Sequence, residues 1–119
     1  MTDGIRVHVT TGETVTVISV SGEIDIASAP ALRAATDTVI GQRTRQLIID
    51  LSSVEFMDST GLAVLIGAAK HLGAASLVVV VTQDHIRKVL AISGVDQLLT
   101  VCDTLAAAFD VLPNTPTGN

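Results

Sequence analysis

Two short, almost uninterrupted apolar runs constrain the fold of this chain more than any other feature. Residues 47–51 and 77–81 consist of Leu, Ile and Val apart from Asp50. Strands that read as continuous apolar runs are covered on both faces by other elements. Both runs are also far below the ~20 residues that a membrane-spanning helix needs. They therefore predict central strands of a sheet that has helices packed against it.

The segment before these runs has a different pattern. In residues 5–10 the apolar Ile5, Val7 and Val9 alternate with polar residues, and residues 14–20 alternate in the same way. Alternation with a period of two is typical of strands with one buried face. Gly12-Glu13 is a turn signal between them, so the two segments are expected to pair as a hairpin.

Four helices are expected around these strands, because apolar residues recur at helical spacing and are bounded by capping residues and glycines. The helix starts are placed at Ser28, Asp58, Asp84 and Asp103, and the first three ends at Gly41, Gly73 and Gly94, with Gly41 in a left-handed conformation. In the last helix, Leu105, Phe109 and Leu112 are expected to face the core. Residues 52–57 are interpreted as a loop and residues 98–102 as an edge strand.

This order of elements predicts a single α/β domain over residues 1–112, with a mixed sheet of four or five strands flanked by about four helices. A chain of 119 residues is long enough for one core. Residues 113–119 are interpreted as a disordered C-terminal tail.

Composition excludes several classes of function. The net charge of −5 opposes binding to nucleic acid, which requires clustered Lys and Arg. The lone Cys102 allows no internal disulfide and indicates a reducing compartment. The first residues lack the basic start and apolar stretch of a signal peptide. We therefore expect a cytoplasmic protein without membrane or nucleic-acid partners.

The most informative stretch is Phe56-Met57-Asp58-Ser59-Thr60-Gly61-Leu62, which joins a buried strand to a helix. Three interpretations are open. Asp58 and its neighbours can simply cap the helix. Ser59 can be a nucleophile. Alternatively, Ser59 can accept a phosphate, because the start of a helix favours negative charge.

The nucleophile interpretation lacks the residues it needs. The G-x-S-x-G elbow is absent because Met57 stands at the first glycine position. His8, His71 and His85 are spread over different elements, and none forms an evident triad with Ser59 and a carboxylate. The sequence therefore predicts a protein that is not an enzyme, with no catalytic residue, no metal site and no cofactor.

Three further features surround Ser59. Gly61 is unfavourable inside a helix, which suggests that another group approaches closely there. Phe56 is interpreted as a hydrophobic staple on the helix. Glu23, Asp25 and Asp58 would form an acidic surface with Glu55 if the loops after the second and third strands lie side by side. Asp25 can equally brace the turn before Ser28.

At these residues the sequence resembles the STAS family, in particular the anti-sigma factor antagonists of bacteria. Gly22-Glu23-Ile24-Asp25 resembles one motif of the family, and the stretch from Phe56 to Leu62, continued by Ala63-Val64-Leu65-Ile66-Gly67, resembles its phosphorylation segment. The similarity extends over about residues 5–110.

The resemblance implies a partner-switching function. Unphosphorylated protein would bind an anti-sigma factor that is also a serine kinase, and this would release the sigma factor. Phosphorylation of Ser59 would end the binding, and a serine phosphatase would restore it. ATP and its metal would belong to these partners. The implied partner-binding residues are Glu23, Asp25, Met57, Asp58, Ser59, Thr60, Gly61 and Leu62, with Met57 and Leu62 giving apolar contact.

Two other functions remain open at this point. The chain can be a STAS module that acts as a scaffold or binds a small ligand without being phosphorylated. An enzyme with Ser59 as nucleophile is the alternative from a different class.

Overall fold

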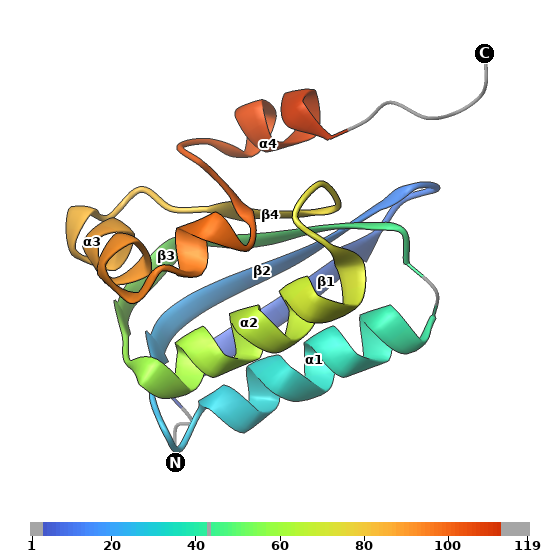
Figure 1. Cartoon of the computed structure of the whole chain (residues 1–119). Coiled ribbons are helices and arrows are strands. Elements are labelled where there is room, and N and C mark those ends of the chain that lie inside the picture. Colours follow the sequence, from blue (N-terminus) through green and yellow to red (C-terminus); the bar gives the residue numbers. More distant parts are fainter. Residues whose placement is uncertain (1–3, 43, 113–119) are drawn as a thin grey trace.

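The computed structural model describes residues 4–42 and 44–112, which form one mixed sheet with helices on both faces (Figure 1). The strand order is β1-β2-β3-β4-β5. β1 and β2 are an antiparallel hairpin, and the pairs from β2 to β5 are parallel. The strands are β1 (Ile5–Thr11), β2 (Val15–Ile24), β3 (Gln46–Met57), β4 (Leu77–Val80) and β5 (Thr100–Cys102).

The two faces of the sheet are covered unequally. Helices α1 (Ala29–Gly41), α2 (Ser59–Leu72) and α3 (Asp84–Ser93) pack on one face with the 3₁₀ turn η1 (Val95–Gln97). The short α4 (Leu105–Val111) lies on the other face, over β4 and β5. The predicted α/β class, the hairpin and the five-stranded sheet are therefore confirmed.

The two apolar runs are central strands, as predicted. In β3, Ile49 faces the large core under α1 and α2, and its neighbour Ile48 faces the smaller core under α4. In β4, Val79 likewise faces the large core and Val78 faces the smaller core. Because both faces are covered, the apolar residues of each run are buried on both sides of the sheet, and only Asp50 is half-buried.

The loop predicted over residues 52–57 is wrong, because β3 continues to Met57. The cause is the partner strand. β2 runs on to Ile24, and its last residues stay in parallel register with β3 after two irregularities, so Glu23 lies opposite Phe56 and Ile24 opposite Met57. The polar residues of this segment led to the prediction of a loop, although the segment is an irregular strand.

Several predicted ends also need correction. The N-caps of α3 and α4 are Gln83 and Thr104, each one residue away from the predicted aspartate. α1 ends at Gly41, but the positive φ angles of the described glycines do not include it. The C-caps Gly73 and Gly94 are confirmed. The edge strand is confirmed but shorter than predicted. The predicted tail lies outside the described residues.

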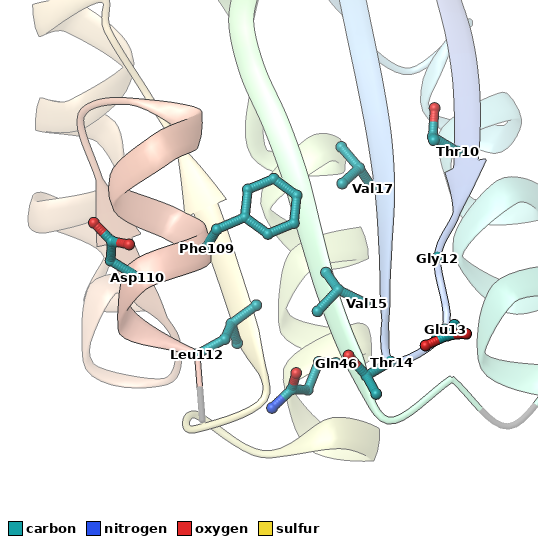
Figure 2. Close-up of a pocket in the computed structure, with 10 residues that line it drawn as sticks. All are labelled: Thr10, Gly12, Glu13, Thr14, Val15, Val17, Gln46, Phe109, Asp110 and Leu112. Atoms are coloured by element: carbon teal, nitrogen blue, oxygen red, sulfur yellow. The ribbon is translucent and has the colours of Figure 1, made fainter. Parts of the chain in front are cut away.

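The last helix packs differently from the prediction. Leu112 is buried as expected, whereas Leu105 and Phe109 are 37% and 49% exposed. Phe109 borders a cavity of about 550 Å³ between α4 and the tip of the hairpin. Figure 2 shows its ring directed from α4 toward Val15 and Val17 of β2. A helix of seven residues is too short to cover the whole of this sheet face.

Candidate functional site

The ends of β2 and β3 lie side by side and carry the candidate site. The backbone N–H of Asp58 donates to the carbonyl of Ile24, at 3.1 Å. This bond ties the start of α2 to the turn that follows β2. The residues after both strands therefore meet at one edge of the sheet, as the parallel arrangement predicted.

Asp58 caps α2, as predicted. Its Oδ1 accepts the backbone N–H of Thr60 at 2.9 Å and also accepts the hydroxyl of Thr60. The hydroxyl of Thr60, followed by its backbone N–H, holds the pKa of Asp58 below the ordinary value of 3.8. Asp58 is thus a charged cap on the positive end of the helix.

Ser59 is the first residue of α2, and its side chain is exposed. Groups at this position of a helix face its unpaired N–H groups and its positive dipole end. The next residue, Thr60, is half-buried and gives its hydroxyl to Asp58. The two neighbouring hydroxyls are therefore in different environments, and Ser59 presents the accessible one.

Gly61 explains how α2 packs so closely on the strand ends. It is buried, and a Cβ at this position would lie 2.6 Å from Cγ of Met57 and 2.8 Å from Cγ2 of Ile24. Carbon atoms do not approach so closely without displacement. The close approach that the sequence suggested at Gly61 is therefore confirmed, and it comes from the protein's own core.

The exposure of Phe56 and Met57 differs from what was expected for them. Met57 is only 3% exposed and packs in the core against Gly61, so its predicted apolar contact with a partner is not supported. Phe56, expected to staple the helix, is 45% exposed. Leu62 is half-buried at the border of the core.

The turn after β2 is held by Asp25 and Ser28. Oδ1 of Asp25 accepts the backbone N–H groups of Ala27 and Ser28, both at 3.0 Å. The hydroxyl of Ser28 donates to the carbonyl of Glu23 at 2.7 Å rather than capping α1, although Ser28 is the N-cap by position. Asp25 thus braces the turn, and Glu23 remains exposed.

Sequence reasoning missed Ile26 at the tip of this turn. Its side chain is 78% exposed. The signal in the sequence was an isoleucine placed directly after Asp25 in the turn that follows the second strand.

Ile26 borders an open groove of about 320 Å³ between α1 and α2. Ser59 precedes the groove-lining Ala63 by four residues and therefore lies on the same face of α2. The groove is lined by Ile26, Ala29, Pro30, Arg33, Thr60, Ala63 and Val64.

Groups for catalysis or metal binding do not gather around Ser59. Nε2 of His85 lies 2.7 Å from the carbonyl of Glu55, and His8 stands on β1 and His71 near the end of α2. Among residues 4–42 and 44–112, no three His, Cys, Asp or Glu side chains are arranged to hold a metal ion. In the same residues, no helix is long and apolar enough to cross a membrane.

Comparison with known proteins decides the family. The model of the STAS domain matches residues 6–108. The chain belongs to the STAS domain family. This STAS domain is 35% identical to the anti-sigma-F factor antagonist RsfB of Mycobacterium tuberculosis over 104 residues, which are 87% of this chain and 85% of that protein.

Other relatives carry similar names. The anti-sigma-B factor antagonist of Staphylococcus aureus is 28% identical over 99 residues, 82% of this STAS domain and 92% of that protein. The crystal structure of an anti-sigma factor antagonist from Mycobacterium paratuberculosis superimposes with a TM-score of 0.86 at 36% identity, covering 92% of this chain and 95% of that one.

The packing around Gly61 yields a stability prediction. Gly61→Ala should lower the free energy of unfolding by about 1–3 kcal/mol, because the new methyl overpacks the contact with Met57 and Ile24. Gly67→Ala is the matched control on the same helix, since a Cβ there meets nothing within 4 Å. It should stabilise by about 0.5–1 kcal/mol. Urea unfolding measures both, and equal effects would contradict this account.

The cap yields a prediction about pH. The lowered pKa of Asp58 means that its stabilising effect is present above the ordinary value of 3.8 and is lost as the pH falls through the lowered pKa. Asp58→Ala should therefore unfold at lower urea concentration than the unmodified protein at pH 7, and the gap should narrow below about pH 4. The exposed Asp37 of α1 supplies the control, Asp37→Ala. A gap for Asp58→Ala that stays constant with pH would disprove the charged cap.

Proposed function

We propose that this STAS domain is an anti-sigma factor antagonist whose unphosphorylated form binds an anti-sigma factor serine kinase. The kinase phosphorylates Ser59, binding ends, and a serine phosphatase restores the active form. This exchange belongs in the cytoplasm, where sigma factors meet RNA polymerase. The observation that carries the proposal is the exposed hydroxyl of Ser59 at the first position of a capped helix. The names of the bacterial relatives agree with it.

The proposed binding surface consists of the exposed residues Glu23, Ile26, Phe56 and Ser59, and we term it the Ser59 surface. Ile26 and Phe56 come from the two neighbouring strand ends and offer the apolar contacts that Met57 cannot. Large apolar side chains in the middle of an interface supply most of its binding energy. Met57, Asp58 and Gly61 support this surface from beneath, and Asp25 holds the turn that carries Ile26.

Phosphate on Ser59 would act on binding rather than on folding. The group adds a charge of about −1.5 to −2 and lies at a helix start, where negative charge is favourable. A docked partner would meet this charge close to the exposed Glu23 and Glu55. If repulsion and steric overlap remove about 3–4 kcal/mol of binding free energy, affinity falls a few hundredfold.

The environment of Thr60 supports Ser59 as the single phosphoacceptor. The hydroxyl of Thr60 points to Oδ1 of Asp58 and is half-buried. A kinase would have to break this bond and approach a carboxylate in order to phosphorylate Thr60. Ser59 presents neither obstacle.

Phosphorylation can be tested directly. Incubation with the cognate anti-sigma factor kinase and ATP should add one phosphate, detected by mass spectrometry. Ser59→Ala should remove the modification because Thr60 does not replace it, and Thr60→Val should retain it. Ser59→Glu should bind the kinase far more weakly than Ser59→Ala does. No gain of mass, or equal binding by the two Ser59 variants, would disprove the switch and favour a STAS module that is never phosphorylated.

The apolar part of the Ser59 surface can be tested in the same binding assay. Phe56→Ser and Ile26→Ser should each weaken kinase binding about tenfold, the loss typical of a central apolar contact. Ile92→Ser is the matched control, because Ile92 is 86% exposed but lies at the far end of α3. Circular dichroism should show all three variants folded. Equal losses for Ile92→Ser and Ile26→Ser would contradict the assigned surface.

A further inference from the structure

The face of the sheet opposite α1 and α2 carries a polar pocket that the proposed function does not use. On this face α4 contacts β4 and β5 and shares a core cluster with Val17 of β2. Among the described residues, it leaves open the part of β1 and β2 around His8 and Ser19. A cavity of about 420 Å³ is found there. We term it the bare-face pocket and define it by Arg6, His8, Ser19, Ser21, Asp50 and Ser53.

The strand register arranges these side chains in two rows across three strands. His8 lies opposite Ser19, which lies opposite Asp50. In the neighbouring row, Arg6 lies opposite Ser21, which lies opposite Ser53. Arg6 and His8 therefore stand on β1, hydroxyls line the middle, and the carboxylate stands on β3. With strands about 4.8 Å apart, the pocket is polarised over about 10 Å.

A bulge in β3 shapes the carboxylate end of the pocket. The register shifts by one residue between the pairs at Ser19 and Ser21, which leaves an extra residue in β3. Oδ1 of Asp50 accepts the backbone N–H of Ser52 at 2.9 Å within this bulge. Bulges redirect side chains and often occur beside binding sites. The carboxylate has a second oxygen, which can accept a hydrogen bond from a ligand.

We infer that the bare-face pocket binds a small phosphorylated polyol. The phosphate would lie between Arg6 and His8, since a guanidinium binds phosphate through paired hydrogen bonds. The hydroxyls of the ligand would donate to Asp50 and exchange hydrogen bonds with the serines. A free anion would make no hydrogen bond to the second oxygen of Asp50, and a neutral sugar would give Arg6 no anionic partner. The volume is within the range of small-ligand sites.

Ribose 5-phosphate is the probe. Inorganic phosphate and ribose, which each carry one half of its chemistry, are the comparison ligands. Titration of the full chain by calorimetry, combined with amide NMR shifts, should show saturable binding of ribose 5-phosphate centred on β1, β2 and β3. Each half should bind at least about tenfold more weakly. Equal binding of inorganic phosphate would overturn the inference by reducing the pocket to an anion site. A functional small-ligand site needs a dissociation constant of about 10 mM or lower. If 10 mM ribose 5-phosphate causes no amide NMR shifts, the inference is therefore also overturned.

Two substitutions test the two ends of the pocket. Arg6→Gln and Asp50→Asn should each weaken binding about ten- to a hundredfold, as expected for loss of a charged hydrogen bond. Asparagine retains an oxygen for the N–H of Ser52, so the bulge in β3 is preserved. Arg45→Gln makes the same charge change at an exposed residue outside the pocket and should leave binding unaltered. Equal losses of probe binding for Arg45→Gln and Arg6→Gln would overturn the inference.

Ser59→Ala should bind the probe normally. A failure of probe binding is therefore independent of the proposed phosphorylation switch.

Discussion

The parallel pairing of β2 with β3 is the interaction on which the candidate site depends. The two strands stay together to Ile24 and Met57, and the bond from Asp58 to the carbonyl of Ile24 continues the pairing into the first turn of α2. Gly61 then lets the helix lie against both strand ends, because it adds no side chain to a contact already filled by Met57. A shift of either strand would move Ser59 relative to the turn at Asp25. The site is therefore a property of the sheet as well as of one loop.

The unequal cover of the sheet separates the buried cores from the two surfaces for which binding is proposed. Three helices bury one face, where the apolar residues of β2 and β3 form the large core. Within residues 4–42 and 44–112, the other face is covered by the short α4 alone, and its polar residues from β1, β2 and β3 stay open. Ser59 lies at the edge between strands and helices, so a partner can approach it without competing for either core. The two proposed surfaces thus lie apart on a common sheet.

The parts of the fold that sequence predicts well depend on local chemistry. Asp58 caps α2 because its carboxylate needs only the next two residues, and Gly73 and Gly94 end helices because their own backbone angles allow it. The burial of Phe56 and Met57 was predicted wrongly, because it depends on a distant strand rather than on local chemistry. Which of them faces the core is decided by two irregularities in pairing with β2, and nothing within residues 52–57 specifies these. Phe109 was misplaced because helical spacing identifies an apolar face but not the extent of sheet beneath it.

A single hydrogen bond accounts for the difference between two adjacent hydroxyls. Thr60 gives its hydroxyl to Asp58, and the same bond lowers the pKa of that carboxylate. Ser59 shares the helix start but takes no part in that bond. A phosphate on Ser59 would leave the cap intact, because the cap depends on Asp58 and Thr60. This division of tasks allows the proposed modification to change the surface that a partner meets while the helix beneath it keeps its position.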